Sequence, residues 1–237
     1  MNVDNNQLLH KNDLAFFGTI TASVTHELNN ILSIINEYSG LLDDMVMAAE
    51  KGKPIKEERI QRIAQNIAEQ IKREQGVIKL LNRFAHRVDN PLVTFNLNEL
   101  VTDITRLSQR FASLKKIELE ITLPEDQIRL TNNSFAVQHV IFSCLKLALE
   151  CSNMADSIKI ILEENESKAI IKIESPAVEK NKGTEDMLNF ISVLSKNLGG
   201  DIENIRVDKN RHLQQISIPF STTDGVIDHQ EDSLNER

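Results

Sequence analysis

The chain has 237 residues, of which 41% are hydrophobic and 26% charged, a composition typical of a globular protein with one large or two small domains. Its formal net charge of −8 argues against nonspecific nucleic-acid binding, which needs a basic surface. No apolar run approaches the roughly 20 residues that cross a bilayer, so we expect no membrane span and a cytoplasmic location.

Residues 1–12 are predicted to be disordered, and a long helix follows from Asp13 to Glu50. Its apolar residues recur in alternating steps of four and three, the pattern of a heptad seam. The seam consists of Phe17, Thr21, Val24, Leu28, Ile31, Ile35, Tyr38, Leu42 and Met45. Gly52 and Pro54 interrupt the pattern and predict a turn.

A second helical stripe follows that turn, which predicts an antiparallel helical hairpin over residues 13–89. The stripe consists of Ile60, Ala64, Ile67, Ile71, Glu74, Ile78, Leu81 and Ala85, and it is widened at its lower end by Val77, Leu80 and Phe84. One hairpin cannot cover both of its apolar stripes. Two hairpins paired as a four-helix bundle would cover them, so we expect a homodimer.

Residues 90–220 change to interleaved strands and helices. Helices are predicted from about Phe95 to Ala112, over Ser134–Cys151 and over Thr184–Asn197. Strands are predicted at 117–123, 127–131, 157–163, 169–174, 201–204 and 213–219. This half is expected to be an α/β sandwich with helices on one face of a mixed sheet, which makes the chain an α+β protein. The acidic tail, residues 221–237, is predicted to be disordered.

The spacing of cysteines and histidines predicts neither a disulfide nor a metal site. Cys144 and Cys151 lie two helical turns apart, roughly 10 Å, which is too far for a disulfide and favours reduced thiols. The histidines have no partners at metal-ligand spacing, so we expect no bound metal.

The stretch THELNNI, residues 25–31, places a histidine, a glutamate and two asparagines within the first helix. With Val24 in the seam, His26 falls farthest from it, and Asn30 lies one turn along the same outer surface. A rigid helix that presents an exposed imidazole provides a nucleophile for in-line attack on phosphorus. Glu27 is placed to hydrogen-bond one ring nitrogen, and Asn30 to orient that glutamate or a water. The alternative is a solvated helix face without a function, which is the commoner meaning of such residues.

The segment FGTITASVTHELNNILSIINEYSGLL resembles the H-box of sensor histidine kinases, and the hairpin resembles their dimerisation and histidine-phosphotransfer domain. The resemblance implies that His26 is phosphorylated, with Glu27 as its base or orienting partner and Asn30 assisting. The family has a proline after the asparagine, where this chain has Ile31, so we expect a straighter helix.

The segment NNSFAVQHVIFSCLKLALE resembles the nucleotide-binding helix of the same family in a degenerate form. Leu147 stands where the family has the asparagine that holds Mg²⁺, and Ser143 matches an earlier asparagine. A leucine has no oxygen with which to coordinate Mg²⁺. ESPAVEKNKG stands in place of the glycine-rich loop that cradles phosphates. We therefore expect a degenerate ATPase-like domain that binds neither ATP nor another cofactor.

Without ATP, the predicted phosphoryl donor or acceptor is the aspartate of a response-regulator receiver domain, which brings its own Mg²⁺. The chain in this respect resembles the dimeric histidine phosphotransferases of bacterial phosphorelays, and an upstream hybrid histidine kinase is a further expected partner. The receiver is expected to contact the helix face around His26. That face comprises Thr19, Ser23, Asn29, Asn30 and Ser33.

Three other functions stay open at this point. A receiver phosphatase would use Glu27 and Asn30 to orient a hydrolytic water, and that activity could survive the loss of His26. A non-catalytic adaptor of a two-component system would bind a kinase or a receiver without taking phosphate on His26. An ATP-dependent histidine kinase would need measurable ATP binding, which Leu147 argues against.

Overall fold

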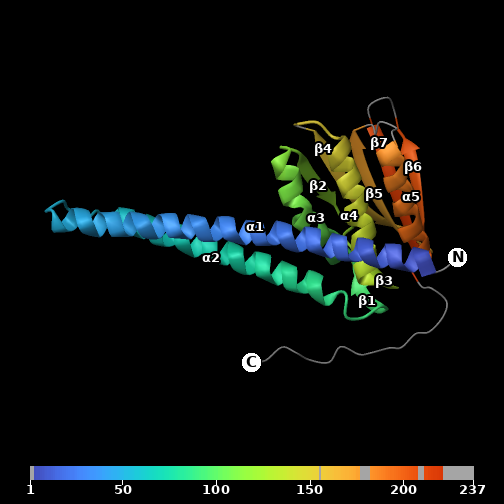
Figure 1. Ribbon diagram of the computed structural model, residues 1–237, viewed down its shortest axis with the longest axis horizontal. Helices are drawn as coiled ribbons and strands as arrows, with labels where there is room; N and C mark the ends of the chain where they lie inside the picture. Colours follow the sequence, from blue (N-terminus) through green and yellow to red (C-terminus); the bar gives the residue numbers. More distant parts are fainter. Residues whose placement is uncertain (1–2, 155, 177–181, 208–210, 221–237) are drawn as a thin grey trace.

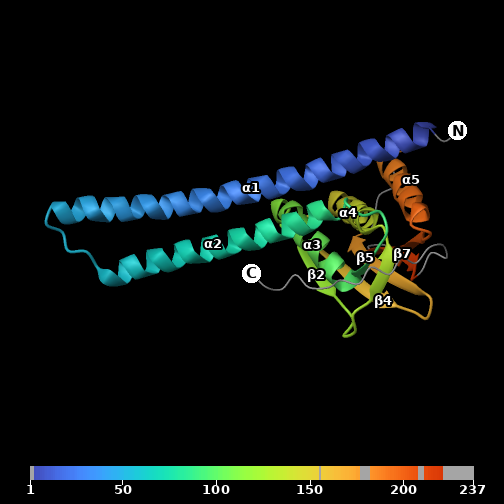
Figure 2. The ribbon, with the colours of Figure 1, turned by 90° about the horizontal axis from the view of Figure 1, so that it is seen from below.

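The fold combines a long helical hairpin with an α/β domain, as Figure 1 shows in a computed structural model that describes residues 3–154, 156–176, 182–207 and 211–220. The hairpin consists of α1 (Val3–Glu50) and α2 (Glu57–His86). Its helices run side by side from the α/β domain to a free tip, as two perpendicular views show (Figures 1 and 2). The predicted α+β class is therefore confirmed, while the predicted disordered tail lies outside the described residues.

Helix α1 begins at Val3 rather than at the predicted Asp13, so the prediction that residues 1–12 are disordered is wrong for the described residues 3–12. No glycine or proline interrupts the first seventeen residues. Tertiary contacts hold the helix just beyond the predicted start, because Asp13 and Phe16 both bind His139 of the α/β domain. An anchored helix propagates at low cost, since nucleation is its expensive step.

The turn at the hairpin tip is built on Gly52, whose φ is +80°. This conformation strains a residue with a side chain but not glycine. The amide of Lys53 donates to the carbonyl of Ala48 over 3.1 Å, which satisfies one of the last carbonyls of α1. The predicted break between the two helices is confirmed.

The α/β domain is built on a five-stranded sheet in the order β2-β4-β5-β7-β6. β2 and β4 are parallel, and the other neighbouring pairs are antiparallel, so the sheet is mixed as predicted. The five strands are β2 (Glu118–Thr122), β4 (Ser157–Glu164), β5 (Lys168–Pro176), β6 (Asp201–Arg206) and β7 (Arg211–Pro219). A separate pair joins β1 (Val93–Asn96) to β3 (Arg129–Asn132) in antiparallel register.

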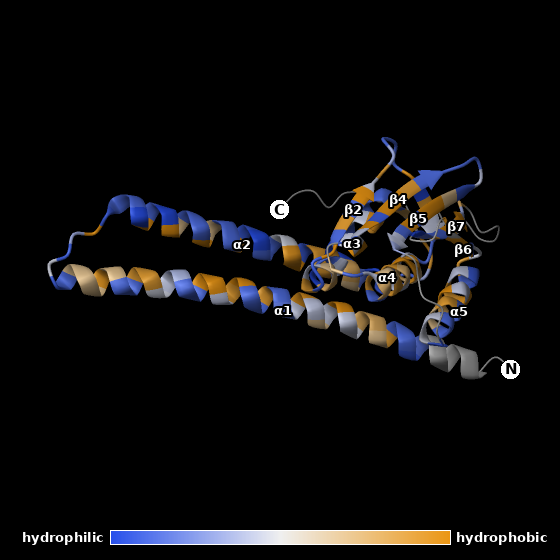
Figure 3. Cartoon of the chain, turned by 90° about the horizontal axis from the view of Figure 1, so that it is seen from above, coloured by the Kyte–Doolittle hydropathy of each residue, from blue (hydrophilic) through white to orange (hydrophobic). Residues whose placement is uncertain are grey.

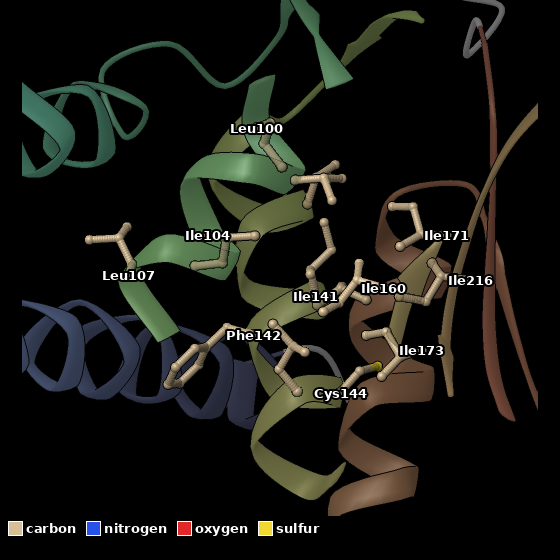
Figure 4. Packing of buried hydrophobic residues seen from close by; sticks show 14 of the residues in the cluster. Leu100, Ile104, Leu107, Ile141, Phe142, Cys144, Ile160, Ile171, Ile173 and Ile216 are labelled. Atoms are coloured by element: carbon tan, nitrogen blue, oxygen red, sulfur yellow. The ribbon is translucent and has the colours of Figure 1, made fainter. Parts of the chain in front are cut away.

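Three helices cover one face of this sheet (Figure 2): α3 (Leu97–Leu114), α4 (Ser134–Cys151) and α5 (Lys182–Asn197). Figure 4 shows Ile141 of α4 beside Ile160 of the sheet, with Ile104 of α3 on the helix side and Ile171 and Ile216 on the sheet side. Ile104, Ile141 and all three strand residues are fully buried, which gives the domain one continuous apolar core.

The glycine pair after α5 is required by close backbone packing. Gly199 has a φ of +70°, which ends the helix. A Cβ on Gly200 would lie 2.4 Å from the carbonyl oxygen of Ser217 on β7, so any side chain would push β6 away from its neighbour. The helix C-cap therefore explains Gly199, and close packing against β7 explains Gly200.

Helix α4 is the one helix of the described residues with the length and hydropathy of a membrane span. Since 72% of it is buried against the rest of the fold, its apolar character is that of a core helix.

A cluster of aromatic rings joins the hairpin to the α/β domain. Phe16 is 3% exposed, stacks on His139 of α4 at a centroid distance of 4.6 Å and meets Phe84 of α2 edge-on at 5.4 Å. Seven of the nine phenylalanines are connected through such contacts: Phe16, Phe17, Phe84, Phe111, Phe135, Phe142 and Phe190. Phe16 and the fully buried Ile20 form a second apolar face of α1, outside the predicted seam.

Ion pairs reinforce the same joint. Asp103 of α3 is almost fully buried and accepts two hydrogen bonds from Arg83 of α2, at 2.9 and 2.6 Å. Arg87 adds a longer contact of 3.5 Å to the same carboxylate. Near the other end of the joint, Nδ1 of His139 lies 2.7 Å from Asp13 of α1. The hairpin and the α/β domain are thus held together by both apolar and charged contacts.

The single hairpin leaves part of the predicted apolar stripe of α2 uncovered. The buried residues of α2 are Ile63, Leu80 and Phe84. Leu80 and Phe84 belong to the predicted widening at the lower end of the stripe, whereas Ile63 lies outside the prediction. The stripe members Ile60, Ile71 and Ile78 are 40%, 43% and 41% exposed. α2 therefore carries both buried and exposed apolar residues, and apolar patches extend along both helices to the tip (Figure 3).

Candidate functional site

His26 lies on the solvent-exposed side of α1, as the seam position predicted. Among the described residues its ring forms no hydrogen bond, so both ring nitrogens are accessible to a reaction partner. The neighbouring turns are held by Val24 and Ile31, which are 5% and 1% exposed. A buried seam therefore fixes the backbone from which the exposed imidazole projects.

Glu27 has a partner other than the expected imidazole. Its Oε1 accepts a hydrogen bond of 2.5 Å from Nη2 of Arg73 on α2, 46 residues away in the sequence. The contact ties the carboxylate beside His26 to the second helix of the hairpin. Since the Glu27 side chain is 27% exposed, water still reaches it. Asn30, one turn along from His26, is exposed.

The predicted receiver-binding residues are not all on the surface. Thr19, Asn29 and Ser33 are exposed, and the hydroxyls of Thr19 and Ser33 bond to carbonyls one turn back. Ser23 is only 6% exposed, so the prediction that it lies on an exposed face is wrong. The α/β domain packs against this side of α1, which seam positions alone do not reveal.

A cleft of about 600 Å³ runs beside His26, between α1, α2 and α3. Three of the predicted site residues, Ser23, Glu27 and Asn30, line its α1 wall. Its charged lining is otherwise cationic and comprises Lys72, Arg73, Arg106 and Arg110. We call this cavity the basic cleft. Four cations against one carboxylate make it strongly positive in a chain whose net charge is −8.

Sequence reasoning missed the four cations of the basic cleft. Lys72 and Arg73 come from α2, and Arg106 and Arg110 from α3, so they converge only when the two domains pack. The spacing of Arg106 and Arg110, one turn apart on a helix, was the single signal available in the sequence.

The two residues that align with asparagines of the kinase nucleotide-binding helix lie in the core. Leu147 is 1% exposed and Ser143 is 4% exposed, both within the buried helix α4. In the described part of the chain, no three His, Cys, Asp or Glu side chains gather in a group that could hold a metal ion. Position 147 thus offers an apolar contact and no oxygen.

No protein-family model matches the chain. The sensor protein DegM of Bacillus sp. (strain B21-2) is 25% identical to it over 185 residues. The match covers 78% of this chain and 46% of DegM, so the chain spans about half the length of that relative.

Solved structures of histidine kinases resemble the chain at low sequence identity. Acinetobacter baumannii AdeS is 15% identical, with a TM-score of 0.48 over 83% of this chain and 98% of that one. Histidine kinase ThkA, in complex with the response regulator TrrA, is 17% identical with a TM-score of 0.48, over 93% of this chain and 67% of that one. The predicted resemblance to the sensor histidine kinase family is confirmed.

Proposed function

Because the chain is a relative of the sensor histidine kinases, we propose that it is a histidine phosphotransferase of a two-component phosphorelay. His26 exchanges a phosphoryl group with the aspartate of a response-regulator receiver domain, without ATP. The protein acts as a cytoplasmic homodimer, and an upstream hybrid histidine kinase is a second partner. Mg²⁺ belongs to the receiver, and the chain itself holds no cofactor.

One observation carries this proposal: His26 is exposed on a backbone fixed by buried residues, beside a cleft rich in cations. An exposed ring allows in-line approach of a phosphoryl group, and a fixed backbone lowers the entropy lost on reaching attack geometry. Nearby cations compensate for the negative charge that the receiver brings.

The chemistry needs one unprotonated nitrogen on His26. Its lone pair forms the N–P bond while the bond from phosphorus to the aspartate oxygen breaks, and that electron pair returns to the carboxylate. Glu27 keeps one carboxylate oxygen beyond its contact with Arg73. We assign this oxygen to accept or orient the proton of the other ring nitrogen, and Asn30 to hold a water or phosphoryl oxygen at the cleft edge.

Two features support transfer without ATP. The buried side chain of Leu147 has no oxygen atom, and Mg²⁺ would need an oxygen ligand at this position. The aromatic joint around Phe16 and Phe84 also packs the α/β domain firmly against the hairpin. A kinase must bring its nucleotide's γ-phosphate within about 3.5 Å of the histidine, which such a joint opposes.

The uncovered stripe of α2 supports a homodimer. Ile60, Ile71 and Ile78 leave apolar surface in water, and pairing with a second hairpin removes it. These three side chains are exposed in the folded single chain, so a second chain reaches them without unfolding the hairpin.

The test compares the wild type with His26→Gln. Each protein is incubated with γ-labelled ATP and Mg²⁺, and separately with phosphorylated receiver domains purified one at a time. We expect no label from ATP, acid-labile and alkali-stable label from a receiver on the wild type, and none on the folded, dimeric variant. Label from ATP on the wild type, or label from a receiver on the variant, would refute the assignment.

Receiver phosphatase activity is the second candidate. Glu27 and Asn30, three residues apart, both line the basic cleft, where a water could be oriented toward phosphorus. Release of inorganic phosphate from a receiver by the His26→Gln variant, abolished by Asn30→Ala, would favour this function. Binding of a receiver without phosphoryl transfer or hydrolysis would instead favour the non-catalytic adaptor function.

A further inference from the structure

Two cavities flank the α1 surface that carries His26. The first is the basic cleft. The second, of about 240 Å³, lies between α1, α3 and α4 and is mainly apolar, with Phe111, Phe142 and Leu149 in its wall. Leu114, at the C-terminal end of α3, lines both cavities and is 72% exposed. Leu114 therefore offers a partner an exposed apolar contact that lies between the two cavities.

Both cavities share their α1 wall with the His26 surface. Thr19, which lines the apolar cavity, lies one heptad before His26, roughly 10 Å along the helix. Asn30, which lines the basic cleft, lies one turn after it. A partner that covers the α1 surface from Thr19 to Asn30 therefore lies over the rims of both cavities, which meet at Leu114 on the end of α3.

The cations of this surface are available to a partner. Among the described residues, Lys72, Arg106 and Arg110 form no ion pair, whereas Arg73 is paired with Glu27. Lys115, in the wall of the apolar cavity, donates to the carbonyl of Leu149 over 2.6 Å and forms no ion pair with a described residue. Unpaired cations around an apolar side chain favour a partner with carboxylates around an apolar side chain of its own.

We propose that Leu114, the basic cleft and the apolar cavity together form the docking surface for the receiver domain, here called the Leu114 surface. It selects receivers that place one large apolar side chain in the apolar cavity and carboxylates over Arg106 and Arg110. This inference rests on the proposed function, since the receiver is the partner that must reach His26. It assigns recognition to the α/β domain and chemistry to the hairpin.

The test uses the full chain and receiver domains from the genome that encodes it, each purified singly and phosphorylated with phosphoramidate. Leu114→Glu is compared with Val193→Glu, a change of an apolar side chain that is 45% exposed on α5. The double variant Arg106→Gln, Arg110→Gln is compared with Arg129→Gln, an exposed arginine of β3. Calorimetry gives the Kd at two salt concentrations, and rapid quench gives the transfer rate at saturating receiver.

We expect Leu114→Glu to raise the Kd at least tenfold while the transfer rate at saturation changes less than twofold. The double arginine variant should weaken binding and reduce its salt dependence. Both controls should bind like the wild type. An unchanged Kd for Leu114→Glu with transfer intact would overturn the inference, and so would a loss of the dimer in that variant, which would make the surface an interface between copies.

If the proposed function is wrong but the docking surface is right, the same experiments give a different set of results. A receiver that binds the wild type and His26→Gln equally, binds Leu114→Glu weakly and never labels His26 would refute transfer and uphold the docking surface. Absence of binding by every receiver would overturn both.

Discussion

Arg73 of α2 donates a hydrogen bond to Glu27 of α1 over 2.5 Å, so the carboxylate next to His26 is positioned by the opposite helix of the hairpin. The Arg73 side chain is 55% exposed, and an exposed pair of this kind contributes only about 0–1 kcal/mol to stability. The main effect of this ion pair is therefore to orient the Glu27 side chain, since it adds little to stability.

Arg73→Gln should slow phosphoryl transfer at saturating receiver by about tenfold to a hundredfold, because a freed Glu27 samples many rotamers. The free energy of unfolding should change by less than about 1 kcal/mol. Rapid-quench kinetics and urea unfolding measure the two effects. Arg59→Gln, on an exposed turn of the same helix, is the matched control. A variant that transfers at the wild-type rate would show that Glu27 needs no positioning.

Asp103→Ala should destabilise the protein by about 3 kcal/mol, since it leaves two arginines without their shared carboxylate. The side chain of Arg87 is only 13% exposed, and burial lowers its pKa. Asp103, by contrast, raises the pKa of Arg83 through its hydrogen bond. Urea unfolding measures the loss, and Glu125→Ala, on an exposed turn, should stay within about 0.5 kcal/mol of the wild type.

Phe16→Ala should cost about 3 kcal/mol or more and loosen the joint between the hairpin and the α/β domain. The ring is buried and touches four other rings, so its loss opens a cavity at the centre of the aromatic cluster. Limited proteolysis should then cut between α2 and α3 faster than in the wild type. Leu14→Ala, two residues away and 74% exposed, should leave both stability and proteolysis unchanged.

Leu147→Asn, which installs the residue of the kinase family, should not create ATP binding and should destabilise the fold by about 3 kcal/mol. The side chain is 1% exposed, so its amide would replace core contacts without gaining access to a metal. Calorimetry with ATP and Mg²⁺, together with thermal unfolding, checks both parts. Heat of ATP binding in this variant would mean that a nucleotide site needs only one residue to be restored.

His212 should make the protein less stable as the pH falls below about 6.5. Burial lowers the pKa of its ring, and Nδ1 has no hydrogen-bond partner among the described residues. The unfolded chain takes up the proton first, so this contribution to stability is complete above pH 6.5 and is lost as the pH falls toward the lower, folded value. His212→Asn should flatten the change in unfolding free energy between pH 7.5 and 5.5, whereas His10→Gln, on the exposed side of α1, should not.

Most helices and strands of this fold can be predicted from local sequence, but the contacts between them cannot. The apolar pattern over Ser134–Cys151 predicts α4 with both of its ends correct, because periodicity is local, and the structure adds that Asn133 caps the start by accepting from the amide of Ala136. The position of His26 on the outside of α1 could be predicted for the same reason. β1 was missed, since four residues are too few to show an alternation.

Phe16 and Phe17 illustrate what the pattern leaves open. Both are apolar, but only Phe17 belongs to the heptad seam, while Phe16 meets a helix more than 100 residues further along the chain. The periodicity of a helix states which side is apolar, not which neighbour covers it. The basic cleft was hidden by the same limit, because its cations come from two helices in different domains.

Helix α1 is one continuous helix of 48 residues, but its two halves differ in how tightly they are packed. Around Phe16 and Ile20, α1 is enclosed by α2 and the α/β domain, whereas its outer half lies beside α2 alone (Figures 1 and 2). Amide hydrogens of α1 in the single chain should therefore exchange over a steep gradient, slowly near Ile20 and quickly near Met47. His26 sits where this gradient begins, so its backbone is held by the slowest-exchanging part of the molecule while the outer half opens and closes independently.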